Sequence, residues 1–109
     1  MPDAAGKRSP VRPHQAKVVG KVYRIQFVKG HPLAEDDMGE CDDENQLISV
    51  CDGLPLGNEQ DTVLHECIHA LDKQFNLKLK EAQVAGLATA TLAFLKDNPK
   101  LFSYLKRKV

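Results

Sequence analysis

The chain of 109 residues contains no tryptophan and only six aromatic side chains. Bases of single-stranded nucleic acid stack on aromatic rings, so this scarcity argues against a platform for such a ligand. Cysteine is also rare: Cys41, Cys51 and Cys67 are the three present, and no two of them have the C-x-x-C spacing. An odd number without that spacing argues against a disulfide framework and a four-cysteine zinc site, and it predicts free thiols.

Long apolar runs are absent as well. No segment approaches the roughly 18 apolar residues of a membrane span, and the N-terminus lacks the apolar stretch of a secretory signal. We therefore expect a cytoplasmic protein with no membrane partner. Net charge is zero, but it is segregated into +6 over residues 1–29, −12 over residues 30–72 and +6 over residues 73–109. The acidic middle block is the first place to look for a site.

The length fits one domain, which we expect to span residues 18–109 behind a flexible basic tail at residues 1–17. The tail has three prolines and few apolar residues, too few to offset the entropy of ordering. β-branched and aromatic residues predict strands at residues 18–28 and 46–51, with a short strand near residues 38–41.

Apolar residues at helical spacing predict helices over residues 58–74 and 79–96. Asn58 is the expected N-cap of the first helix. The predicted buried stripe of that helix consists of Leu64, Cys67, Ile68, Leu71 and Phe75. The stripe predicted for the second consists of Val84, Ala88, Thr91, Leu92 and Leu95. Asn98 followed by Pro99 predicts a short third helix over residues 99–106, which completes an α+β fold.

The first helix carries His65-Glu66-Cys67-Ile68-His69, an H-E-x-x-H motif. Positions i and i+4 project from the same helix face, so the two imidazoles can hold one metal ion. Glu66 lies farther around the helix, which suits a carboxylate beside the metal rather than one bound to it. At this composition the motif arises by accident with a chance of roughly 0.8%, so we favour a metal site over a pair of solvated histidines.

Catalytic zinc usually has three protein ligands, and the third is open among Asp72, Glu81 and the distant His31. Asp72 lies ~10 Å along the axis from His65, which suits support of an imidazole or a simple solvated carboxylate. Glu81 is favoured because it continues the expected packing face of the second helix, where an unpaired carboxylate is costly. Its alternative role is that of a first-turn residue favoured by the helix dipole.

Residues 39–99 resemble the minimal zincin proteins of phages and prophages, distant relatives of the ImmA/IrrE-type metallopeptidases. The matching elements are Gly39-Glu40-Cys41-Asp42, Gln46-Leu47-Ile48-Ser49-Val50, Thr62-Val63-Leu64-His65-Glu66-x-x-His69-Ala70-Leu71, Glu81-x-x-Val84-x-x-Leu87-Ala88 and Lys96-Asp97-Asn98-Pro99. The resemblance implies a small antiparallel sheet packed on the two helices, zinc held by His65, His69 and Glu81, and Glu66 as the catalytic carboxylate. Metzincins are excluded, because their longer motif needs Gly and His where this chain has Asp72 and Phe75.

The leading hypothesis is thus a zinc-dependent metallopeptidase that acts on a peptide or protein, with Glu66 as general base. Residues 46–51 are the expected strand along which a substrate aligns. A second electrophilic group in such a site is often a Tyr or a His, and the residues of these types are Tyr23, His31 and Tyr104. A structural role is the simpler interpretation of each.

Two other hypotheses remain open. One is a regulatory or pseudo-enzymatic zincin fold, a phage accessory protein that binds a partner and keeps zinc for stability. The weaker one is a DNA-associated protein that uses its basic ends. Cys67 is interpreted as a small core residue, and the carboxylates of residues 35–44 as a solvated acidic loop, because their spacing differs from that of a calcium-binding EF-hand.

Overall fold

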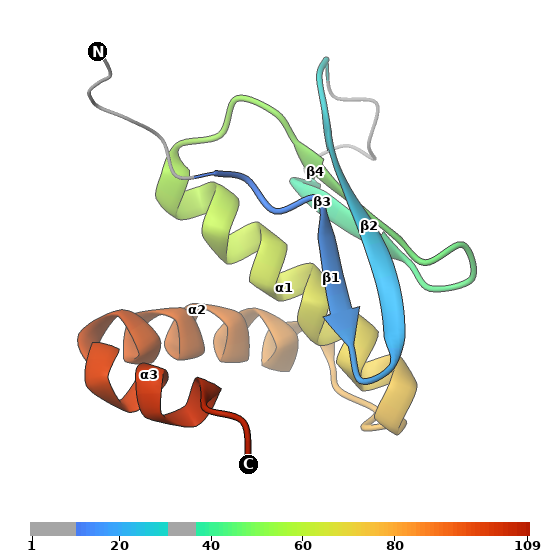
Figure 1. Ribbon diagram of the computed structural model, residues 1–109. Helices are drawn as coiled ribbons and strands as arrows, with labels where there is room; N and C mark the ends of the chain where they lie inside the picture. The colour runs from blue at the N-terminus through green and yellow to red at the C-terminus, as the bar shows by residue number, and fades with distance from the viewer. Residues whose placement is uncertain (1–10, 31–36) are drawn as a thin grey trace.

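The computed structural model describes residues 11–30 and 37–109. Its elements are β1 (Gln15–Val18), β2 (Lys21–Val28), β3 (Gly39–Asp42), β4 (Leu47–Cys51), α1 (Leu56–Phe75), α2 (Glu81–Asp97) and α3 (Pro99–Lys106). The sheet lies on one side of α1, α2 packs across another side, and α3 folds back on α2 (Figure 1). The α+β class and the order of its helices are as predicted. No helix in the described segments combines the length and the apolar character that crossing a membrane requires.

The four strands form one sheet in the order β1-β2-β4-β3. β1 pairs with β2, and β3 with β4, in antiparallel fashion, whereas β2 and β4 are parallel. The sheet is therefore mixed, and the expectation of a purely antiparallel sheet is wrong, because the chain leaves β2, forms the edge strand β3 first, and only then places β4 between them. In the described part of the chain, β1 and β3 are the edge strands, and β4 has a neighbour on each side. The expectation that residues 46–51 align a substrate by strand addition is therefore wrong as well.

The core lies between the sheet and α1. Tyr23 and Ile25 on β2 are buried, while the alternating Val22, Arg24 and Gln26 are exposed, as period-two patterning predicts. On β4, Ile48 and Val50 are fully buried, and they pack with Ala70 of α1 in the same cluster. Small and β-branched side chains allow the helix to approach the sheet closely.

A tight turn divides the stretch that the sequence predicted as a single strand over residues 18–28. Val19 and Gly20 have φ values of 43° and 93°, the left-handed conformation that both central residues of a type I′ hairpin require. The turn pairs β1 with β2, so the prediction of an unstructured tail through residue 17 is wrong for the residues of β1. Residues 1–10 lie outside the described part of the chain.

Arg12 also belongs to the folded part of that segment. Its guanidinium bonds the carboxylates of Asp52 and Glu59 at 2.6 and 2.8 Å and lies 4.1 Å from the centroid of the Phe27 ring. Glu59 is buried in the first turns of α1, where an unpaired charge would be costly. The Arg12 guanidinium therefore compensates the buried charge of Glu59. Its hydrogen bond to Asp52 holds the pKa of that carboxyl below its usual value.

Val19 gives a first testable prediction. A β-branched residue is strained at positive φ, and the Val19 side chain is exposed, so Val19→Asn removes strain without loss of packing. We expect the free energy of unfolding in urea to rise by about 1 kcal/mol. Val22→Asn, an equally polar change at an exposed site within β2, serves as the control and should give no gain. A Val19→Asn protein no more stable than the wild type would contradict the strain argument.

The start and the buried face of α1 differ from the prediction. The helix begins at Leu56, because Pro55 supplies the first accepting carbonyl, to Glu59 N–H at 2.9 Å, and the expected N-cap Asn58 lies inside the first turn. The residues of α1 that are most buried are Glu59, Thr62, Glu66 and Ala70. The predicted stripe from Leu64 to Leu71 is only half-buried, and Phe75 is exposed. Since α1 contacts the sheet on one side and α2 on another, its burial follows its neighbours rather than its own apolar pattern.

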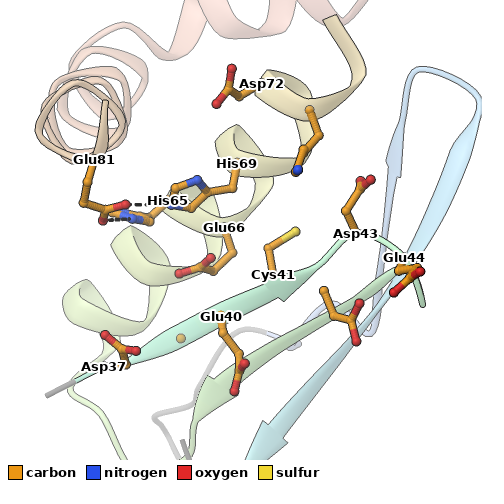
Figure 2. A pocket seen from close by; sticks show the side chains of 13 residues that line it. Asp37, Glu40, Cys41, Asp43, Glu44, His65, Glu66, His69, Asp72 and Glu81 are labelled. Atoms are coloured by element: carbon orange, nitrogen blue, oxygen red, sulfur yellow. Dashed lines mark ion pairs between the residues drawn. The ribbon is translucent and has the colours of Figure 1, made fainter. Parts of the chain in front are cut away.

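The packing of α2 and the start of α3 follow the predictions. Val84 and Ala88 are fully buried, and the other predicted stripe residues, Thr91, Leu92 and Leu95, are half-buried. The third helix begins at Pro99 after Asn98. Because α2 packs on α1, its first residue, Glu81, lies beside the histidine pair of α1 (Figure 2).

Candidate metal centre

His65, His69 and Glu81 come together at one point between α1 and α2 (Figure 2). The two histidines lie one turn apart on α1, with ring centroids 4.9 Å apart. The carboxylate of Glu81 bridges them: Oε2 lies 2.8 Å from Nε2 of His65, and Oε1 lies 3.0 Å from Nε2 of His69. All three side chains therefore direct a ligand atom to the same small volume.

The chemistry of this donor set fits a transition metal. One ligand atom from each side chain can be chosen so that all lie within 4.8 Å of one another. A tetrahedral zinc ion with bonds of 2.0–2.1 Å holds its ligand atoms about 3.3 Å apart, so only small side-chain movements separate the arrangement from a coordinated one. Two imidazoles and one carboxylate are also the donor set of one class of catalytic zinc site. The group could thus hold a metal ion.

Glu81 reaches this position for a reason other than the predicted one. Its side chain is 69% exposed, so it does not lie on the packing face of α2, and the burial argument for it is wrong. The preceding connection instead sets its place. Asn76 ends α1 in the left-handed conformation, and the Asp72 carboxylate accepts a hydrogen bond from the backbone N–H of Leu79 at 3.3 Å. This contact joins α1 to the residues immediately before Glu81, and it is the role that the structure gives Asp72.

Glu66 lies beside the donor group, between α1 and β3 (Figure 2). Its side chain is only 6% exposed, and no hydrogen bond or ion pair reaches its carboxylate from residues 11–30 and 37–109. Gly39 permits the close approach of β3, because a Cβ at Gly39 would lie 2.7 Å from the Thr62 methyl, 3.0 Å from the Ser49 carbonyl oxygen and 3.2 Å from Cγ of Glu66. Burial, with smaller contributions from the charges of Glu81, Asp37 and Glu40, raises the pKa of Glu66 to about 7.

The raised pKa predicts how the stability of the metal-free protein depends on pH. The folded state holds the Glu66 proton more tightly than the unfolded chain does, so stability falls as pH rises from about 4.5 to about 7. Glu66→Gln removes this penalty. We expect it to raise the free energy of unfolding of the metal-free protein by about 2 kcal/mol at pH 8 and by much less at pH 5. Asp97→Asn, at an exposed position on α2, should show no such pH-dependent gain, and an equal effect at both pH values for Glu66→Gln would contradict the assignment.

A cavity of about 900 Å³ opens in front of this group, between β3 with its following turn, α1 and the start of α2. Carboxylates from eight residues line it, and Lys73 is the only Lys or Arg in the described lining. The sequence predicted a solvated loop for Asp37 and Glu40, whereas the structure places both in the cavity wall. The one sequence signal of this role was the charge of the acidic block. Cys41 also lines the cavity, but burial and the neighbouring Glu66 raise its thiol pKa to about 12, so it stays protonated and is a poor competing ligand.

None of the other side chains that the sequence suggested for this site is placed at the donor group by the described part of the chain. Tyr23 is fully buried in the core, where its hydroxyl bonds Asp43, and Tyr104 is exposed on α3, so neither tyrosine lines the cavity. His31 lies outside the described residues. Cys67 packs against the core cluster, as predicted, and none of the three cysteines forms a disulfide.

Comparison with known proteins adds no relative: no family model, no curated protein and no solved structure matches this chain. Assignment to a family therefore has no support beyond the H-E-x-x-H motif and the geometry of its histidines with Glu81.

Proposed function

We propose that the protein is a zinc-dependent peptide hydrolase in which His65, His69 and Glu81 hold the metal ion and Glu66 is the general base. The observation that carries the proposal is the juxtaposition of a three-residue donor group with a buried, unpartnered carboxylate one position from its first histidine. A site that only stabilises the fold has no need of such a carboxylate. Its burial is costly in the metal-free protein, which is common where function rather than stability fixes a residue.

A zinc ion in this group would act as a Lewis acid toward a carbonyl oxygen and would lower the pKa of a bound water to about 7. Glu66, buried beside the donor group, would accept the proton of the attacking water and would deliver it to the departing amine. Burial between α1 and β3 restricts the Glu66 side chain, which keeps its carboxylate directed at the cavity.

The outer edge of β3 supports a peptide as substrate. Among residues 11–30 and 37–109, β3 is an edge strand that lines the cavity and pairs with β4 alone, so its outer backbone groups could pair with an extended chain. Main-chain pairing of this kind binds a peptide with little dependence on its side chains. It would also bring the peptide past Gly39, where a Cβ would lie 3.2 Å from Cγ of Glu66.

Metal analysis and proteolysis together test the proposal. Protein purified without chelator should contain one zinc per chain and should cleave an unstructured peptide library, with the products identified by mass spectrometry. Removal of zinc by a chelator should abolish cleavage, and added zinc should restore it. Zinc bound without any cleavage would leave the metal as a stabilising ligand only, and failure to bind zinc would overturn the proposal.

The Asp72 contact yields a prediction about metal affinity. Asp72→Ala removes the acceptor that holds Leu79 and frees the segment before Glu81, so zinc affinity should fall about tenfold, in the range for groups that orient metal ligands. Asp72→Asn removes the same charge but keeps an acceptor oxygen, and it should change affinity much less. Competition with a chromophoric chelator measures both. Equal losses in the two variants would mean that Asp72 acts through charge rather than through the hydrogen bond.

A further inference from the structure

The charge of the cavity is one-sided. Carboxylates of eight residues line it against a single lysine, and even a bound divalent cation leaves negative charge in large excess. Three of these carboxylates, Asp37, Glu40 and Asp42, belong to the segment that enters and forms β3, the strand along which a peptide would lie. A substrate therefore meets a negative field on the edge that would bind it.

A smaller hollow of about 200 Å³ adjoins the metal group on the side toward the beginning of α1. Its lining includes Asp37, Met38, Asp61 and Thr62 together with His65 and Glu66. It shares His65, Glu66 and Glu81 with the larger cavity, so a side chain that enters it belongs to a residue next to the reacting bond.

Asp37 and Asp61, two of the carboxylates around the hollow, have no basic partner in the described part of the chain. Asp61 accepts a hydrogen bond from the Thr89 hydroxyl at 2.9 Å, but no Lys or Arg within residues 11–30 and 37–109 pairs with Asp61 or Asp37. Glu66 also lines the hollow; it is more than nine-tenths buried and has no hydrogen-bond or ion-pair partner among those residues. Met38 and Thr62, which carry apolar atoms, line the same hollow.

Building on the proposed peptidase function, we propose that this hollow receives a lysine or arginine side chain of the substrate, so that the protein cleaves peptides beside a basic residue. The cationic head lies between Asp37 and Asp61, where charge-assisted hydrogen bonds are available, and its aliphatic stem covers Met38 and Thr62. The same carboxylates repel an acidic side chain, and a neutral side chain forms no ion pair with them. Selectivity therefore comes from both attraction and repulsion.

Binding measured without turnover tests the inference. Two fluorescein-labelled alanine-based hexapeptides, one with a central arginine and the other with its neutral isostere citrulline, are titrated with zinc-loaded Glu66→Gln protein and followed by anisotropy. We expect the arginine peptide to bind about tenfold more tightly at low salt, and the preference to shrink as ionic strength rises. In the Glu66→Gln background, Asp37→Asn and Asp61→Asn should each reduce it to about threefold or less. Asp97→Asn, the same charge change at the far end of α2, should leave it intact.

The outcomes separate this inference from the peptidase proposal. Equal affinity for the two peptides, no binding of either, or a preference that both Asp37→Asn and Asp61→Asn leave unchanged overturns the basic-side-chain site. The wild-type protein is then incubated with the same peptides. A preference for arginine without cleavage keeps the site and rejects the peptidase, whereas cleavage of both peptides at the same rate keeps the peptidase and rejects the selectivity.

Discussion

Glu66→Gln is expected to lower kcat for peptide cleavage about a thousandfold, because glutamine has the size of glutamate but cannot accept the proton of the attacking water. Zinc content should stay at that of the wild type, since Glu66 is outside the donor group of His65, His69 and Glu81. KM should change little, because the substitution impairs proton transfer from the attacking water and leaves substrate binding intact.

The measurement is a steady-state assay on a cleaved peptide, with metal analysis of the same preparation. Asp97→Asn, a matched acid-to-amide change outside the site, should retain full activity. A Glu66→Gln protein that still cleaved at the wild-type rate would remove Glu66 from the mechanism. Glu66→Gln is also expected to stabilise the metal-free protein. Measurement of both kcat and the free energy of unfolding of this variant should therefore separate the cost of Glu66 to folding from its contribution to catalysis.

Glu81→Ala is expected to weaken zinc binding by roughly a hundredfold or more. Structural zinc binding is worth about 10–16 kcal/mol over four ligands, so the loss of one protein ligand removes about 3 kcal/mol, the equivalent of more than two powers of ten. The fold should persist, because the Glu81 side chain is 69% exposed and packs against little. Chelator competition gives the affinity, and circular dichroism checks the fold.

Glu40→Gln is the control for Glu81→Ala. Glu40 also lines the cavity and contributes to its negative field, but it lies outside the donor group. A loss of affinity similar to that of Glu81→Ala would show that zinc responds to the overall charge of the cavity and that no specific third ligand exists at position 81. A small loss in Glu40→Gln beside a large one in Glu81→Ala supports the ligand role.

Local sequence patterns predicted most of the helices and strands. They failed where contacts between residues far apart in the chain determine the structure. The helices were predictable because their apolar spacing and the Asn98-Pro99 pair are local signals, and β4 because β-branched residues cluster there. The parallel pairing of β2 with β4 depends on where the chain crosses after residue 28, which no local pattern contains. Gly20 was the visible sign of the turn that divides the first predicted strand.

Polar burial was the harder problem in α1. Its most buried residues include Glu59 and Glu66, which any hydrophobicity pattern assigns to solvent. Glu59 is compensated by Arg12, 47 positions away in the chain, and a partner at that separation cannot be recognised from the sequence alone. Glu66 has no such compensation in the described part of the chain, and this difference between two buried acids on one helix is what distinguishes a structural carboxylate from a candidate functional one.

The candidate site was predictable in its parts but not in its surroundings. The i, i+4 spacing places His65 and His69 on one helix face regardless of the rest of the fold. The position of Glu81 depends on the turn after α1 and on the Asp72 contact, and the acidic cavity depends on β3 lying against α1 at Gly39. The sequence therefore indicated a metal pair, whereas the enclosure around it required the fold.

The acidic edge strand has one more consequence, for the behaviour of the protein in concentrated solution. An uncovered strand is a template for another copy of itself, and chains that stack edge to edge can aggregate. Two copies of β3 paired in this way would bring Glu40 and Asp42 of one chain against those of the other, with the acidic turn residues Asp43 and Glu44 nearby. We expect the mutual repulsion of these carboxylates to oppose such pairing at neutral pH, so the charges that line the cavity would also disfavour edge-to-edge assembly of the protein.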